Sequence, residues 1–295
     1  MTTLDEYLPR IRAMYPSLVI QSTSFVTVGA HNNAVMVKSS DGNWVFRFAK
    51  NDSGKLALSR ELCVLDSIRN HTPVNVPVPI IREPDAIAYR MLEGEHLTYW
   101  TIATLNDVAQ QRIADQLGDF LRELHNTPAG LPVPDNTHED KDGMFSQIYD
   151  QVKEKLYPYL EAHQCAWVDR LFADAAGIYA NLPPEQRSKL IYNDFKIGHV
   201  LYDPISQNLS GILDFGIACY DVPDIDICNL MQCFGESFVT RMFTNYPEAR
   251  QMLPRARYGV WLMELLALME GIVENNPHKL CAHIGIPRDI RFPIL

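Results

Sequence analysis

Several features that would place this chain in a special class of protein are missing. It has no low-complexity run and no apolar stretch of the roughly eighteen residues that cross a membrane. Its first residues carry no basic segment followed by an apolar one, so no secretory signal is predicted. We expect a globular, cytoplasmic protein with neither a membrane-spanning helix nor a disordered tract.

Cysteine is present, but not in a pattern that binds a metal. The six cysteines include no CxxC pair, and most of them lie among apolar residues. We therefore expect buried free thiols, and neither a zinc site nor a disulfide framework.

Positive charge is in deficit as well. The chain has 26 Lys and Arg against 36 Asp and Glu, which gives a net charge of −10. Nucleic acids and anionic membranes both require grouped Lys and Arg, so neither is expected as a partner. The acidity is compatible with a cationic small substrate, and more simply with a charge that only keeps the protein soluble.

The first third of the chain has the pattern of a small sheet with one helix. β-rich runs alternate with turn residues, of which Ser39-Ser40-Asp41-Gly42 is a strong hairpin signal. Apolar residues then recur with a helical period. Strands are predicted at residues 25–28, 33–38, 43–49, 74–81 and 87–91, and a helix at residues 54–70.

The rest of the chain is dominated by helical periodicity. We expect a β-rich lobe at residues 1–92, a hinge at 93–96 and a helical lobe at 97–295. Such an arrangement places a cleft between two lobes, which is a common location for a ligand. Helices are predicted at residues 108–125, 143–159, 165–182, 225–234 and 255–275.

The most informative residues are Asp194, His199 and Asp214. Transfer of a phosphoryl group to a hydroxyl requires one carboxylate to orient the hydroxyl and separate ligands to hold magnesium. Asp194 fits the first role, and His199 with Asp214 fits the second. Residues 200–202 and 210–213 flank a turn-rich segment and predict a hairpin, which would bring its two ends together. The alternative is that each aspartate only caps or forms a turn.

A cation for the phosphates and a carboxylate to hold that cation are also present. Arg47 lies on the third predicted strand and Glu61 on the helix that follows. Lysine is the expected residue on this strand, and arginine keeps its charge but changes the geometry. Lys50, near the end of the strand, is a rival candidate, and a solvated arginine with an unrelated glutamate is the other explanation.

Two further features have both a functional and an ordinary explanation. The loop that begins with Gly29 could cover phosphates with its backbone amides, but an ordinary hairpin turn explains this loop equally well. Asp226 follows Pro223 and Asp224 at the start of a helix, where acidic residues are good caps. The functional explanation is that a buried Asp226 braces the loop that carries Asp194.

Together these residues resemble the aminoglycoside phosphotransferase family of antibiotic kinases, from about Phe25 to Tyr246. Histidine as the second metal ligand is similar to the 2″-aminoglycoside and macrolide phosphotransferase branches. The residues that carry the resemblance are Arg47, Glu61, Asn193, Asp194, His199, Asp214, Phe215, Gly216, Pro223 and Asp226.

The resemblance implies an α+β, protein-kinase-like fold of two lobes. The small β-rich N-lobe, residues 1–92, would bind the nucleotide, and the larger helical C-lobe, residues 97–295, would carry the catalytic loop and the acceptor site. It implies transfer of the γ-phosphate of ATP or GTP, with Mg²⁺, to a hydroxyl. Asp194 would accept the hydroxyl proton, His199 and Asp214 would bind magnesium, and Arg47 with Glu61 would position the phosphates. The nucleotide base would lie against the linker formed by Met91, Leu92 and Glu93.

The chain departs from the family in two places. Tyr192 stands where the family usually has a histidine that braces the catalytic loop. On the acceptor side, aminoglycoside kinases usually place several acidic residues after the metal-binding aspartate. This chain offers Asp221, Glu236 and, on its last helix, Glu270. These few carboxylates make a less charged acceptor, such as a macrolide, credible.

The sequence therefore predicts a small-molecule kinase that modifies an aminoglycoside or a macrolide and gives resistance to it. A metabolite kinase acting on choline, homoserine or a sugar, and a nucleotide-binding pseudokinase, are the alternatives. We expect a small-molecule acceptor as the partner and a monomer or weak dimer.

Overall fold

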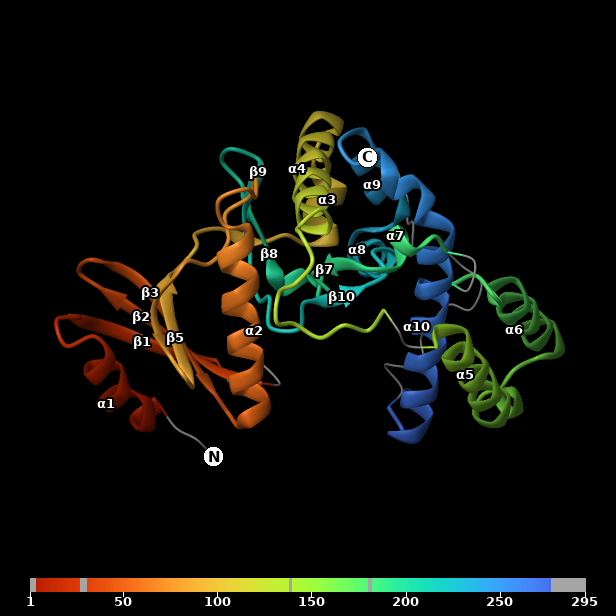
Figure 1. Ribbon diagram of the computed structural model, residues 1–295, viewed down its shortest axis with the longest axis horizontal. Coiled ribbons are helices and arrows are strands. Elements are labelled where there is room, and N and C mark those ends of the chain that lie inside the picture. Colours follow the sequence, from red (N-terminus) through yellow and green to blue (C-terminus); the bar gives the residue numbers. More distant parts are fainter. Residues whose placement is uncertain (1–3, 27–30, 138–139, 180–181, 277–295) are drawn as a thin grey trace. The chain divides into compact units, whose positions relative to one another are not determined.

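The computed structural model describes residues 4–26, 31–137, 140–179 and 182–276 (Figure 1). The chain divides into two compact units. We call them the N-terminal unit, Met1–Leu97 with Thr127–Val133 and Gly198–Ala218, and the C-terminal unit, Thr98–Asn126 with Pro134–Ile197 and Cys219–Leu295.

The N-terminal unit is built around an antiparallel five-stranded sheet in the order β1-β2-β3-β5-β4. The turn predicted at residues 39–42 joins β2 to β3, with Ser39 opposite Gly42. Gly42 has a φ of +120°, a conformation that glycine adopts without strain. The elements of the sheet and its helices are α1 (Leu4–Met14), β1 (Ile20–Val26), β2 (Asn32–Ser39), β3 (Gly42–Ala49), α2 (Asp52–Ile68), β4 (Pro79–Glu83) and β5 (Ala86–Arg90).

The two helices of this unit cover opposite faces of the sheet, because successive strand residues point to opposite sides. On one face Tyr7 and Ile11 of α1 pack against Phe46 and Phe48 of β3. On the other face Leu58 of α2 packs against residues of β5. Figure 1 shows α1 and α2 on the two sides of the sheet. Residues of β3 that alternate with Phe46 and Phe48 therefore face α2.

A second, three-stranded sheet in the N-terminal unit has the order β6-β8-β9. Its strands are β6 (Glu95–His96), β8 (Val200–Asp203) and β9 (Asn208–Ile212). Val200 is paired with Ile212, so the hairpin predicted at residues 200–213 is confirmed.

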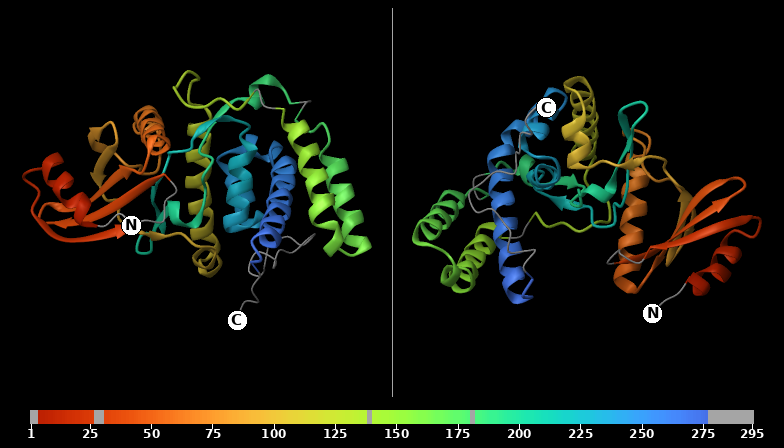
Figure 2. Two further views of the ribbon diagram at one scale, coloured as in Figure 1. Left: turned by 90° about the horizontal axis from the view of Figure 1, so that it is seen from below. Right: turned by 180° about the vertical axis from the view of Figure 1, so that it is seen from behind.

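The C-terminal unit is mainly helical and contains a short sheet of β7 paired with β10. Its main core joins α5, α6 and α10 through Phe145, Val152, Val168 and Leu265 (Figure 2). The elements of this unit are α3 (Tyr99–Thr104), α4 (Asp107–His125), α5 (Lys141–Lys155), η1 (Tyr157–Tyr159), α6 (Ala162–Ala175), α7 (Pro184–Arg187), β7 (Lys189–Ile191), β10 (Cys219–Asp221), α8 (Asp224–Phe234), α9 (Glu236–Val239), η3 (Thr240–Thr244), η4 (Pro247–Gln251) and α10 (Leu253–Val273). The 3₁₀ segment η2 (Ile197–His199) spans the boundary of the two units.

The predicted α+β class is confirmed, and the differences are local. The helix predicted at residues 165–182 ends at Ala175, because Gly177 takes a left-handed φ of +71° that terminates it. The helix predicted at 143–159 gives way to a 3₁₀ turn around Pro158. The helix α1 was not predicted. Within the described ranges, no helix is both long and apolar enough to span a membrane.

Candidate active site

Arg47 on β3 is fixed by a bidentate ion pair. Its Nη1 donates to both oxygens of Glu61 on α2, at 2.6 and 2.7 Å. The Glu61 side chain is fully buried, and Arg47 is 9% exposed. The prediction that Arg47 and Glu61 form a pair is confirmed. Lys50 is exposed after the end of β3, so Arg47 is the cation that reaches Glu61.

Asp214 is the third member of this network. Its Oδ1 accepts a hydrogen bond from Nη2 of Arg47 at 3.0 Å. Asp214 takes a left-handed φ of +62°, which is uncommon for a residue with a side chain. Three of the five guanidinium N–H groups are used by the two carboxylates, and a planar fork of this kind also suits a phosphate.

The hairpin places His199 beside Asp214. The two residues flank the strands β8 and β9, and the Leu213 amide donates to the His199 carbonyl at 2.9 Å. Nε2 of His199 lies 3.6 Å from Oδ2 of Asp214, the carboxylate oxygen that is not bonded to Arg47. An imidazole nitrogen and a carboxylate oxygen at this separation can both contact one cation.

Burial and charge act against each other in this network. Burial raises the pKa of Glu61 to about 7, although the Arg47 guanidinium opposes the rise. Burial alone would lower the pKa of Arg47, but the Glu61 and Asp214 carboxylates outweigh it and hold that pKa above its ordinary value. Arg47 is therefore charged at any physiological pH.

The predicted linker contacts β3 and β9 of the same unit. The Met91 amide donates to the Asn43 carbonyl at 2.9 Å, and Asn43 Nδ2 reaches Glu93 Oε1 at 3.5 Å. The Leu92 side chain covers Gly211, where a Cβ would approach Leu92 Cδ1 to 2.7 Å. The role of these residues toward a nucleotide stays a prediction. Gly29 lies outside the described residues.

Asp194 belongs to the C-terminal unit, in the loop that follows β7. Its side chain is 24% exposed and lies 3.1 and 3.2 Å from Nζ of Lys196. The residue before it, Asn193, has a φ of +65°. The loop at Asn193 therefore depends on neighbours that hold a conformation rarely adopted by residues with a side chain.

Asp226 supplies one such support. Its two oxygens accept the backbone N–H groups of Tyr192 at 2.9 Å and Asn193 at 2.7 Å. Asp226 is completely buried, on the first turn of α8. The interpretation of Asp226 as a brace for the Asp194 loop is confirmed.

His125, at the end of α4, was missed by the sequence analysis. Its Nε2 lies 3.0 Å from Oδ2 of Asp226, and its Nδ1 lies 2.9 Å from the Tyr246 hydroxyl. An ionised carboxylate can only accept, so Nε2 of His125 carries the hydrogen toward Asp226, and in the neutral imidazole the Tyr246 hydroxyl donates to Nδ1. His125 is 2% exposed and contacts Oδ2, the carboxylate oxygen that also accepts the Tyr192 amide.

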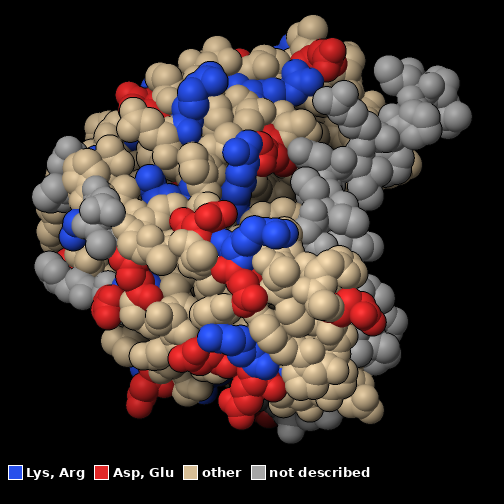
Figure 3. Space-filling model, turned by 90° about the vertical axis from the view of Figure 1, so that its right-hand side faces the viewer, with Lys and Arg blue, Asp and Glu red and all other residues tan. Residues whose placement is uncertain are grey.

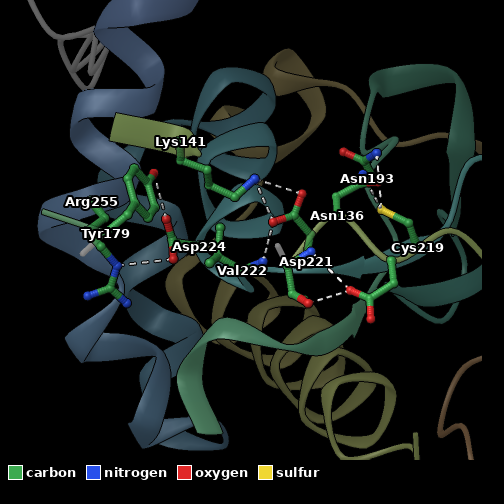
Figure 4. Close-up of polar contacts among 11 residues, drawn as sticks. Asn136, Lys141, Tyr179, Asn193, Cys219, Asp221, Val222, Asp224 and Arg255 are labelled. Carbon is green, nitrogen blue, oxygen red and sulfur yellow. Dashed lines mark hydrogen bonds and ion pairs between the residues drawn. The ribbon is translucent and has the colours of Figure 1, made fainter. Parts of the chain in front are cut away.

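The side chain of Asn193 has a partner on β10. Its Nδ2 donates to the Cys219 sulfur at 3.7 Å, as does Nδ2 of Asn136 (Figure 4). Cys219 is 2% exposed. Sulfur is a weak acceptor, and two amide donors converge on it here.

Tyr192 fills the interior behind the loop. It is fully buried, and its ring lies 4.4 Å from that of Phe195. The Cys233 thiol on α8 donates to the Phe195 carbonyl at 3.5 Å. The loop is thus held through its backbone by Asp226 and Cys233, and the Tyr192 ring packs against Phe195.

The three carboxylates predicted to meet the acceptor lie on separate elements of the C-terminal unit. Asp221 is buried on β10, Glu236 begins α9, and Glu270 is exposed on α10. Whether they contact an acceptor stays a prediction.

The chain matches known proteins along most of its length. Residues 22–261 match the model of the phosphotransferase enzyme family. The chain belongs to this family. This phosphotransferase is an enzyme of the kinase type with the protein-kinase-like fold, as the resemblance implied.

The phosphotransferase is similar to proteins with different acceptors. It is 22% identical over 274 residues to the homoserine kinase of Parvibaculum lavamentivorans, a match that covers 88% of this chain and 81% of that one. Among solved structures, an APH(2″) enzyme with GDP and kanamycin shares 24% identity at a TM-score of 0.76 and covers 93% of this chain and 94% of its own. Macrolide 2′-phosphotransferase type I shares 19% sequence identity at a TM-score of 0.66, and the match covers 96% of both chains.

The raised pKa of Glu61 predicts a pH-dependent stability. The folded carboxyl keeps its proton up to about pH 7, whereas the unfolded one releases it near its ordinary pKa of 4.5. The contribution of Glu61 to the free energy of unfolding is thus fully present below pH 4.5 and lost as pH rises through about 7. The loss is roughly 3 kcal/mol at most.

Thermal unfolding of the natural chain and of Glu61→Gln between pH 4.5 and 8 tests this. The stability of the natural chain relative to the variant is expected to fall as pH rises to about 7 and then to level off. A relative stability that stays constant, or that grows with pH, would contradict the assignment.

Asp226→Asn is expected to destabilise the fold by about 1–3 kcal/mol, because one buried backbone N–H of the loop then faces an amide donor. Hydrogen exchange should show lost protection at the amides of Tyr192 and Asn193. Asp150→Asn is the matched control, since the Asp150 side chain is 79% exposed and should change stability by less than about 0.5 kcal/mol. Equal effects of the two substitutions would refute the bracing role.

Proposed function

We propose that this phosphotransferase transfers the γ-phosphoryl group of ATP or GTP to a hydroxyl of an antibiotic-type small molecule. The observation that carries the proposal is Arg47, which joins Glu61 on α2 to Asp214 after β9 in one charged network. A triphosphate requires a fixed cation of this kind, held by a carboxylate that cannot move away.

Asp194 is the residue that acts on the acceptor. Its carboxylate orients the hydroxyl and takes its proton as the oxygen bonds to the γ-phosphorus. The bond from the γ-phosphorus to the bridging oxygen breaks, and the nucleoside diphosphate leaves with the electron pair. The partly exposed position of Asp194 and the support of its loop by Asp226 favour this role.

His199 and Asp214 suit magnesium as a partial ligand set. Magnesium in kinases is usually held by one or two carboxylates, and phosphate oxygens and waters complete its shell. Asp214 offers Oδ2 to such an ion while Oδ1 stays with Arg47. When bound, the ion supplies positive charge that offsets the negative charge of the triphosphate.

The donor and the acceptor class are supported by the relatives. Solved structures similar to this chain were determined with GDP, ATP and ADP, and their names include aminoglycoside and macrolide phosphotransferases. A second candidate is a metabolite kinase, because the similar curated protein is a homoserine kinase. An inactive pseudokinase is disfavoured by the intact ion-pair network around Arg47.

Asp194→Asn is expected to reduce turnover by about 10²–10⁴-fold and to leave nucleotide affinity unchanged, because it removes only the proton acceptor. Nucleotide consumption and calorimetric titration of the nucleotide measure the two quantities. Asp150→Asn serves as the control and should leave both at the level of the natural chain. Undiminished turnover in Asp194→Asn would show that another group accepts the proton.

His199→Ala is expected to raise the magnesium concentration that half-saturates nucleotide binding, by roughly tenfold. Calorimetric titration of nucleotide at graded magnesium concentrations measures this without turnover. His71→Ala, at an exposed histidine of the same unit, is the control. An unchanged magnesium dependence in His199→Ala would remove His199 from the ligand set.

A further inference from the structure

Asn193, the residue before Asp194, is held by its side chain as well as by its backbone. From this we infer that Cys219 and Asn136 are positioning residues that fix the Asn193 side chain. Through the Asn193 backbone they set the direction of the Asp194 carboxylate. The inference rests on the proposed function, because it concerns the group that acts on the acceptor hydroxyl.

Asn193 is anchored from two elements of the C-terminal unit. Its backbone N–H donates to Asp226 on α8 at 2.7 Å, and its Nδ2 donates to the Cys219 sulfur on β10 at 3.7 Å (Figure 4). Its φ of +65° is uncommon for a residue with a side chain and requires support from the surroundings. A rotation of the Asn193 backbone would break one of these bonds and would turn the next residue, Asp194.

Cys219 lies where its sulfur can meet the loop from the neighbouring strand. On the short sheet it is paired with Ile191, two residues before Asn193. Cys219 is 2% exposed, so water does not readily replace the sulfur as an acceptor. Loss of the sulfur would deprive Nδ2 of Asn193 of an acceptor in the interior, which favours a different position of that side chain.

The residues before α5 lie beside Cys219 as well. The Asn136 amide donates to the Tyr220 carbonyl at 2.9 Å, and the Tyr220 amide donates to the Pro134 carbonyl at 2.8 Å. These two bonds form a parallel bridge to β10 and fix the backbone of Asn136. Its Nδ2 donates to the Cys219 sulfur at 3.7 Å, so the sulfur is held between two amides.

The start of α5 attaches this segment to β10 a second time. On the face shown in Figure 3, acidic and basic side chains lie next to one another at the surface. Lys141 differs, because its side chain is only 10% exposed and its Nζ lies 2.8 and 3.0 Å from the two oxygens of Asp221. Cys219 and Asp221 are two positions apart on the strand and share one face of it. The donor of Asn136 is therefore fixed from both sides of its segment.

The position of Asp194 matters for the rate more than for binding. Misplacement of a reacting group by about 1 Å can cost about 10²-fold in rate. Nucleotide binding does not require the Asp194 carboxylate in the mechanism that we propose. Loss of the Cys219 sulfur is therefore expected to lower kcat and to leave KM for the nucleotide nearly unchanged.

The test measures turnover of Cys219→Ala with kanamycin, erythromycin and homoserine, per nucleotide-binding site counted by calorimetric titration. We expect kcat to fall about tenfold with the acceptor that the natural chain turns over fastest, and KM for the nucleotide to change by less than about twofold. Cys228→Ala is the matched control, because Cys228 is also buried and lies against Gly259 of α10. An equal fall of kcat in both variants, or no fall in Cys219→Ala, would overturn the positioning role.

Serine at position 219 separates positioning from packing. Cys219→Ser keeps an acceptor for the two amides and should retain kcat within about threefold of the natural chain. If the thiol only fills space, serine should be no better than alanine, because a hydroxyl is costly to bury. Asn136→Ala, at a half-buried position, should lower kcat by roughly two- to fivefold. An unchanged kcat in that variant would remove Asn136 from the positioning role.

Hydrogen exchange tests the anchoring apart from the proposed function. The Asn193 and Asp194 amides should exchange at least about threefold faster in Cys219→Ala than in Cys228→Ala. Equal exchange in the two variants would overturn the anchoring by Cys219, whichever acceptor is used. Phosphorylation of none of the three acceptors by the natural chain would instead count against the proposed function, and the inference would be lost with it.

Discussion

The completely buried carboxylate of Asp226 holds the loop that carries Asp194. Two backbone N–H groups converge on it, and they come from the residues just before Asp194. Without this acceptor, the left-handed Asn193 would have unpaired polar groups in the interior, which is costly. His125 and Tyr246 complete the arrangement by orienting the carboxylate. The chemistry that we propose for Asp194 depends on this fixed backbone.

In the N-terminal unit a functional group is also fixed by buried partners, but these partners are charged side chains and not backbone N–H groups. Arg47 is held by a fully buried glutamate and by Asp214, so its guanidinium is positioned before any ligand arrives. Such preorganisation avoids reorientation of dipoles during the reaction. In the C-terminal unit, Lys141 pairs with Asp221 and Arg257 pairs with Glu236.

The sequence predicted features that depend on local pattern. Arg47 and Glu61 could be paired because one lies on a strand and the other on the helix that follows, and the hairpin that joins His199 to Asp214 has clear turn residues. His125 could not be found in this way, because its partner Asp226 is about a hundred positions further along the chain. The partners of Asp221 and Glu236 were missed for the same reason, since a sequence shows a charge but not what neutralises it.

The central claim is that the γ-phosphoryl group reaches an acceptor hydroxyl. Phosphorus NMR of the natural chain with nucleotide, magnesium and a panel of aminoglycosides, macrolides and metabolite alcohols measures this most directly. The account predicts one new phosphate ester on an acceptor for each nucleoside diphosphate formed. Release of inorganic phosphate without an ester, or an unchanged nucleotide spectrum with every acceptor, would contradict it.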